Sequence, residues 1–241
     1  MDKEEKLAIR LRERWNVDFH IPIDIFSLVL EKINNLTLMW YDMDESISGC
    51  CSKNNKDNLI LINSNHTKGR QNFTLAHEIY HLLFDDEKGY FCSVNLNNKN
   101  EIKANNFASY LLLPSCGLEK YIEMNNIEKW DMNNIIKCEQ IFQISHHAML
   151  VRLKKEKYIT EKEFEEFKKD VKINAIDLGF DTILYEKSPN NKKFYTIGEL
   201  IPLIKKSYLN DKISKGLMEE ILIKNYRSDI VYNLKEDSNF D

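Results

Sequence analysis

The sequence predicts an α+β fold, with two short strands near the N-terminus and helices over most of the remaining chain. The predicted strands are residues 36–41 and 59–63, which are rich in β-branched, aromatic and other apolar side chains. Elsewhere, apolar residues recur at helical spacing. The chain has 241 residues, 43% hydrophobic and 30% charged, so it can bury one sizeable core with a small appended unit.

The first third of the chain alternates predicted helices and strands. Residues 3–15 carry apolar side chains at helical spacing, and Asp24 is placed to cap a second helix over 25–33. The polar residues 51–55 are expected to form a turn between the two strands. An apolar helix over 71–84 follows.

The remainder is predicted to be mainly helical after a loop over residues 85–100. A helix starting near Glu101 should end at Leu113, because the proline that follows disfavours helical backbone before it. Further helices are expected over 119–158, 197–209 and 212–226. Another helix should begin at the capping box formed by residues 160–163.

One motif on the helix over 71–84 points to chemistry: His77-Glu78-Ile79-Tyr80-His81. Helical spacing puts His77 and His81 on one face, where both rings can bind one metal ion, and Glu78 can reach a water beside it. This H-E-x-x-H arrangement is typical of zinc-dependent peptidases. Three polar groups on so apolar a helix are costly to bury without a partner, and a metal ion supplies one.

A catalytic zinc site needs a third protein ligand, and Glu101 is the best candidate. The metzincin pattern would need Gly and His downstream of the motif, where this chain has Phe84 and Glu87. A later helix instead carries Glu101 and Asn105 on one face, so that Asn105 can orient one histidine ring.

Three other carboxylates remain alternatives for the third ligand, although they follow the motif too closely to fold back easily. They are Asp85, Asp86 and Glu87.

Charge and cysteine content narrow the class of protein further. The net charge of −4 gives no support for general nucleic-acid binding. The charged N-terminus does not resemble a secretory signal, and no apolar run approaches the ~20 residues of a membrane span. Five cysteines without a C-x-x-C pair predict free thiols. We therefore expect a cytoplasmic protein.

Two blocks closely resemble the ImmA/IrrE family of metallopeptidases. Residues 70–83 read RQNFTLAHEIYHLL, and residues 101–114 read EIKANNFASYLLLP. The family patterns are R-x-x-F-T-x-A-H-E-x-x-H and E-x-x-A-N-x-F-A-x-x-L-L-x-P. Residues 142–153 also resemble the family's helix-turn-helix-like block. The resemblance covers roughly residues 1–158, and Tyr80 departs from it because many members have Gly there.

The resemblance implies an architecture of three parts. A zincin-like core, with a small twisted sheet on the H-E-x-x-H helix, would occupy residues 1–125. A helix-turn-helix-like segment would follow over 126–170, and a mainly helical extension over 171–241. By analogy with zincins, the strand 59–63 would hold an extended substrate by main-chain pairing.

The resemblance also implies a function. Family members cleave, or trigger cleavage of, a helix-turn-helix repressor of the phage type, which releases genes for mobile-element transfer or stress response. We expect His77, His81 and Glu101 to hold Zn²⁺, with Mn²⁺ as an alternative, and Glu78 to act as general base.

The group that stabilises the tetrahedral oxyanion is left open by the sequence. Its candidates are Tyr110, His146, His147 and Arg152.

Two non-catalytic functions compete with peptide cleavage. In one, residues 131–158 act as a helix-turn-helix that binds DNA or protein, helped by Arg152, Lys154, Lys155 and Lys157. In the other, the metal site binds the repressor without cutting it, and Glu78 would then have no role as a general base. No direct contact with nucleic acid or membrane is expected.

Overall fold

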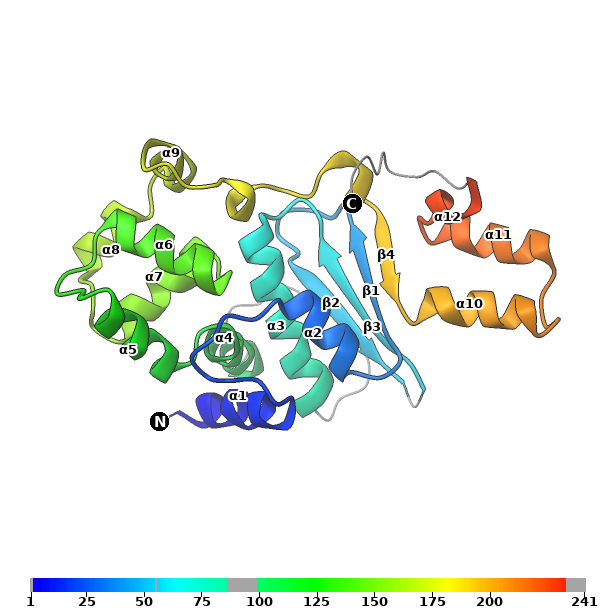
Figure 1. Ribbon diagram of the computed structural model, residues 1–241, viewed down its shortest axis with the longest axis horizontal. Coiled ribbons are helices and arrows are strands. Elements are labelled where there is room, and N and C mark those ends of the chain that lie inside the picture. The colour runs from blue at the N-terminus through cyan, green and yellow to red at the C-terminus, as the bar shows by residue number, and fades with distance from the viewer. Residues whose placement is uncertain (1, 55, 86–98, 233–241) are drawn as a thin grey trace.

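A four-stranded sheet stands at the centre of the molecule, with helices on both sides (Figure 1). The computed structural model describes residues 2–54, 56–85 and 99–232. The fold is mixed α+β, as predicted.

The sheet has the strand order β2-β3-β1-β4. The two predicted strands, β1 (Leu36–Tyr41) and β3 (Asn58–Asn63), lie parallel at its centre. β2 (Gly49–Lys53) pairs antiparallel with β3, and β4 (Tyr195–Gly198) pairs antiparallel with β1. The sequence predicts neither edge strand: it predicts a turn over residues 51–55 and a helix over 197–209.

The position of β3 corrects the prediction that residues 59–63 pair with substrate. β3 is bonded to β1 on one side and to β2 on the other, so its backbone groups are already used. The strand with one unpaired side near the predicted motif is β2, at the edge of the sheet.

The motif helix is α3 (Lys68–Phe84), which packs against β2 and β3 and against α4 (Lys99–Leu112). Thr67 caps its N-terminus by accepting a hydrogen bond from the backbone N–H of Arg70. Ala104 and Ala108 of α4 are fully buried, and their small side chains let α4 approach α3 closely. These two helices carry the metal motif.

The N-terminal helices brace α4 and the sheet. α1 (Lys3–Arg14) packs on α4, and its buried Arg12 donates hydrogen bonds to the carbonyl oxygens of Leu111 and Leu112. α2 (Ile25–Lys32) begins at Asp24, whose side chain caps it as predicted.

A helical lobe lies beside α3 and α4 (Figure 1). Residues 143–145 join its second and third helices, and Thr160 and Glu163 form the predicted capping box. Its helices are α5 (Ser115–Met124), α6 (Met132–Phe142), α7 (His146–Lys155), α8 (Glu161–Phe167) and α9 (Val171–Asp177).

The C-terminal part runs back across the molecule from this lobe to the sheet (Figure 1). Two 3-10 turns, η1 (Ile183–Tyr185) and η2 (Asn190–Lys192), lead into β4. The extension expected from residue 171 is therefore mainly helical but contributes one strand to the central sheet.

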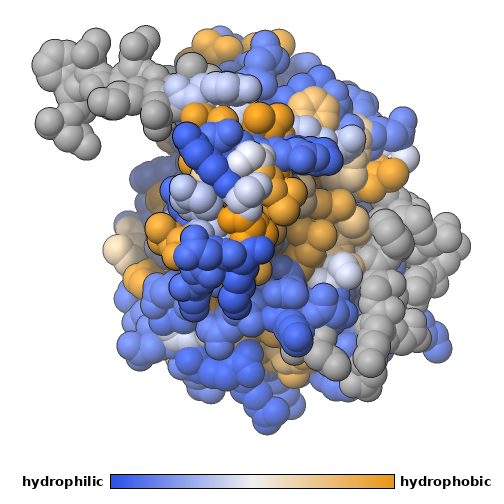
Figure 2. Space-filling model, turned by 90° about the vertical axis from the view of Figure 1, so that its right-hand side faces the viewer, coloured by the Kyte–Doolittle hydropathy of each residue, from blue (hydrophilic) through white to orange (hydrophobic). Residues whose placement is uncertain are grey.

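Three short helices follow β4: α10 (Leu200–Leu209), α11 (Lys215–Lys224) and α12 (Ser228–Tyr232). Pro202 lies in the first turn of α10, where its missing N–H is tolerated. A small separate core of Ile201, Ile204 and Leu222 holds them together, and apolar side chains show between polar ones on this side of the molecule (Figure 2).

Among the described residues, no helix has both the length and the apolar character that crossing a bilayer requires.

Candidate metal centre

Three side chains from α3 and α4 converge on one point. The Nε2 atoms of His77 and His81 lie 3.1 Å apart. A carboxylate oxygen of Glu101 lies 3.1 Å from the Nε2 of His77, and the other lies 3.5 Å from that of His81. One ligand atom from each residue falls within 4.8 Å of the others, so the three groups can hold a single metal ion.

The other ring nitrogens of both histidines face oxygen acceptors. The Nδ1 of His77 lies 2.9 Å from Oδ1 of Asn105, as predicted, and the Nδ1 of His81 lies 2.5 Å from Oδ2 of Asp85. Each Nδ1 therefore donates its proton outward and leaves the Nε2 lone pair facing the other ligands.

Asp85 thus orients a histidine and does not join the three converging groups. Two of the predicted alternatives for the third ligand, Asp86 and Glu87, lie outside the described residues.

The spacing of these atoms fits a tetrahedral metal ion. Zinc bonds of ~2.0–2.1 Å place neighbouring ligand atoms about 3.3–3.4 Å apart, close to the separations found here. Burial opposes protonation of His77, but its hydrogen bond to Glu101 and the charges of Glu78 and Glu101 raise its pKa above the usual value. The site therefore attracts positive charge.

Glu78 lies beside the edge strand β2 and is 1% exposed. A Cβ atom added to Gly49 would come within 2.7 Å of a Thr74 methyl group and 3.5 Å of a Glu78 carboxylate oxygen. Only a glycine lets β2 run this close to α3. Burial, followed by the charge of Glu78, raises the pKa of the neighbouring Cys51 thiol, so this cysteine stays protonated at neutral pH.

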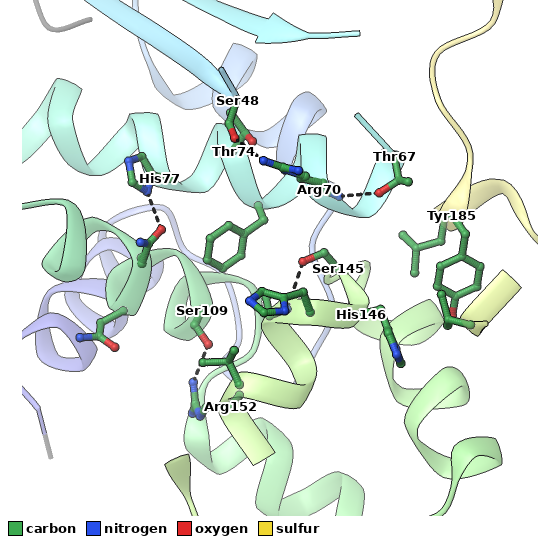
Figure 3. Close-up of a pocket in the computed structure, with 18 of the residues that line it drawn as sticks. Ser48, Thr67, Arg70, Thr74, His77, Ser109, Ser145, His146, Arg152 and Tyr185 are labelled. Carbon is green, nitrogen blue, oxygen red and sulfur yellow. Dashed lines mark hydrogen bonds between the residues drawn. The ribbon is translucent and has the colours of Figure 1, made fainter. Parts of the chain in front are cut away.

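A cavity of about 740 Å³ extends from His77, Glu78 and Glu101 along α3 to Arg70. Figure 3 shows Thr67 and Arg70 on one side of it and Ser145 and Arg152 on the other. The volume falls within the range of small-molecule and substrate pockets.

Two of the four predicted oxyanion donors belong to buried structural networks. His146 contacts Glu139 through Nδ1 (2.7 Å) and the carbonyl oxygen of Phe167 through Nε2 (2.9 Å). Arg152 is paired with Glu156, donates to Ser109 and Ser115, and stacks 3.9 Å from the Tyr110 ring. These contacts hold both side chains in the lobe.

The other two candidates also line the cavity. The Tyr110 hydroxyl contacts Asp2 (3.1 Å) and Lys155 (3.3 Å). His147 is exposed and lies edge-on to the ring of Phe164.

Sequence reasoning gave no role to Arg70, which lines the same cavity. A signal was available: Arg70 precedes His77 by seven residues, which places both on one face of a helix.

Residues 42–154 match the family model Peptidase_M78, described as the IrrE N-terminal-like domain. This range contains His77, Glu78, His81 and Glu101 and both blocks of the sequence resemblance. No curated protein matches the chain.

Proposed function

Because residues 42–154 form an IrrE N-terminal-like domain of a peptidase family, we propose that this chain is a metal-dependent endopeptidase. The observation that carries the proposal is the convergence of His77, His81 and Glu101 beside Glu78, at one end of a cavity. Two imidazoles and one carboxylate are a donor set of zinc peptidases, so zinc is the proposed metal, with manganese as the alternative.

Glu78 is proposed as the catalytic proton carrier. A metal ion held by the three ligands supplies Lewis acidity, which polarises a carbonyl group and acidifies water. Glu78 accepts the proton of the attacking water and delivers it to the leaving amine. Asn105 and Asp85 keep the two rings in the orientation this chemistry needs.

β2 is proposed to hold the substrate backbone. It is an edge strand, it borders α3, and Gly49 brings its backbone close to Glu78. An extended peptide can add to such an edge by main-chain hydrogen bonds. This strand takes the place of residues 59–63.

The proposed substrate is a helix-turn-helix repressor of the phage type, on the strength of the sequence resemblance. A DNA-binding function is less well supported, because three of the four cations invoked for it have partners within the chain. Arg152 pairs with Glu156, Lys154 with Glu161 and Lys155 with Asp2.

Chelation and metal return test the proposal. The purified chain, supplied with zinc or manganese, is incubated with fluorescein-labelled casein and, separately, with a helix-turn-helix repressor encoded beside its gene. Cleavage that 1,10-phenanthroline stops and added metal restores is the expected result. Cleavage that persists in the chelator would contradict a metal mechanism. Binding of the repressor without cleavage would favour the non-cleaving regulator.

A further inference from the structure

The end of the cavity away from the metal ligands carries a cation, Arg70. It precedes His77 by seven residues, so their backbones lie about 10 Å apart along one face of α3. An extended peptide advances ~3.3 Å per residue. A substrate side chain about three residues from the bond cut at the metal centre would therefore reach the level of Arg70.

Arg70 makes no ion pair within the described part of the chain. Its guanidinium donates to the Ser48 hydroxyl at 3.1 Å. Burial lowers the pKa of Arg70 and the charge of Glu45 opposes this shift, but the Glu45 carboxylate forms its ion pair with Lys187, at 3.1 Å.

Other cations around the same cavity do have acidic partners. Lys155 pairs with Asp2, and Lys172 with Glu186 at 3.0 Å. Arg70 is therefore the lining cation best placed to take a negative charge from outside the chain.

Apolar side chains from four different elements line the cavity with Arg70. They are Phe73 of α3, Val151 of α7, Val171 of α9 and Leu184 of η1. Leu184 is buried against α3, since a Cβ added to Gly69 would lie 3.3 Å from it. These groups can pack around an apolar substrate side chain next to a charged one.

The wall that includes Leu184 is fixed to both sides of the cavity. The Tyr185 hydroxyl lies 2.9 Å from the buried carboxylate of Glu139, and the carbonyl oxygen of Glu186 accepts a hydrogen bond from the N–H of Lys68. Residues 171–185 lie outside the matched range 42–154. Family membership therefore does not specify this wall, and it can set the selectivity of this chain.

We propose that the Arg70 end of the cavity is a recognition subsite for an aspartate or glutamate side chain of an extended peptide, flanked by an apolar residue that contacts Phe73, Val151 and Leu184. This proposal rests on the proposed function, because the distance between the subsite and the cleaved bond is counted from the proposed metal centre. Charge complementarity with Arg70 selects the acidic residue.

The direction of the peptide follows from β2. Ser48 contacts Arg70 at one end of the strand, and Lys53 contacts the carbonyl oxygen of Leu82 at the other. A peptide paired antiparallel to β2 runs from the Lys53 end towards Ser48, and antiparallel pairing is the commoner kind. The acidic residue then lies on the C-terminal side of the cleaved bond.

Cleavage specificity is the first test. The metal-loaded wild-type chain digests a random decapeptide library, and the products are sequenced by mass spectrometry. Acidic residues should be enriched near the third position after the cut. Arg70→Glu should reverse this preference to lysine and arginine, with a change in kcat/KM of about tenfold for matched peptides, as expected for a partly desolvated charge pair. Arg70→Lys should keep the acidic preference.

Binding is the second test, and it does not require turnover. Two labelled decapeptide pools, one with a single Asp and one with a single Lys, are titrated with Glu78→Gln protein and followed by fluorescence anisotropy. The Asp pool should bind several-fold more tightly, and adding Arg70→Glu should remove the difference. Lys205→Glu on the exposed face of α10 is the control for net charge and should leave the preference intact.

The two tests separate the subsite from the proposed function. Cleavage without an acidic preference would overturn the subsite alone. An Arg70-dependent acidic preference in binding, without cleavage by the wild type, would support the subsite and overturn the proposed function. An absence of both binding preference and cleavage would overturn both. An Arg70-dependent preference before the cut would support the subsite with the peptide parallel to β2.

Discussion

Among the described residues, two clusters combine largely buried histidines with a carboxylate, and they differ in where the ring nitrogens of the histidines point. In the first, His77 and His81 turn their Nδ1 atoms towards Asn105 and Asp85, and both Nε2 atoms face Glu101. Three ligand atoms therefore face one another, an arrangement that calls for a shared cation.

In the second cluster, His146 faces an acceptor at both ring nitrogens. Nδ1 lies 2.7 Å from Glu139 and Nε2 lies 2.9 Å from the carbonyl oxygen of Phe167. Burial opposes protonation of His146, but the hydrogen bond and charge of Glu139 raise its pKa above the usual value. The Tyr185 hydroxyl contacts the second oxygen of Glu139.

In the second cluster each ring nitrogen of the histidine faces a different acceptor, whereas in the first cluster two ring nitrogens from different histidines face the same carboxylate. Each ring nitrogen of His146 lies within hydrogen-bond distance of an oxygen acceptor, so neither is directed at a position where a metal ion could bind. A buried histidine beside a carboxylate thus indicates a metal site only when the lone pairs of several side chains converge on one point. When each ring nitrogen already faces its own acceptor, the pair instead connects two elements of the fold. Four substitutions test this distinction.

Glu78→Gln should have the largest effect and should act on catalysis alone. Loss of the proton carrier is expected to lower kcat by ~10²–10⁴-fold. Metal content should stay at the wild-type level, because Glu78 is not one of the three converging groups. Steady-state kinetics and elemental analysis measure the two quantities. Peptidase activity near the wild-type level would rule out this mechanism.

Glu139→Ala should act on stability alone. Removing one partner of a buried ion pair is expected to lower the free energy of unfolding by ~3–5 kcal/mol, and here it also frees η1 from α6. Denaturant titration measures the loss. The folded variant should bind metal as the wild type does. A protein that loses its metal while remaining folded would make this cluster part of the metal centre.

Glu101→Ala should remove most of the bound metal with little loss of stability. A lost ligand should weaken binding by more than the ~10–100-fold expected for a lost orienting group. Elemental analysis after dialysis gives the metal stoichiometry, with the exposed Glu119→Ala as control. Unchanged stoichiometry would move the third ligand to Asp85, Asp86 or Glu87.

Asn105→Ala should have the smallest effect, on metal affinity. The His77 ring loses the acceptor at its Nδ1, and the metal dissociation constant is expected to rise by ~10–100-fold. Competition with a chromogenic chelator measures it. Asn106→Ala is the matched control, since Asn106 contacts Lys155 and not a metal ligand. Equal affinities in the two variants would show that Asn105 does not orient His77.

Much of the arrangement of His77, His81 and Glu101 in the candidate metal centre could be predicted from the sequence, because its parts are local. The four-residue spacing of the histidines and the face shared by Glu101 and Asn105 follow from helix geometry alone. Helices α2, α3 and α4 were predicted within a few residues, since caps and apolar periodicity act over short distances.

The edge strands could not be predicted from the sequence, because each becomes a strand only by pairing with another segment of the chain. Tyr195–Gly198 becomes a strand only by lying against β1, more than 150 residues earlier. Residues 51–53 of β2 fall in the predicted polar turn over 51–55, because the end of this strand is polar and solvated. For the same reason the sequence could not tell that residues 59–63 are internal.

The sequence by itself determined the ligand types, their spacing and the helix that presents them, because these depend on residue order and helical period. Only the tertiary structure decided that Asp85 orients His81, that Glu139 binds His146, and that the edge strand beside Glu78 is β2. It also placed Val171, Leu184 and Tyr185 in the lining of the same cavity as Arg70. The edge position of β2 and the lining of the cavity depend on the packing of segments far apart in the chain, which no local pattern encodes.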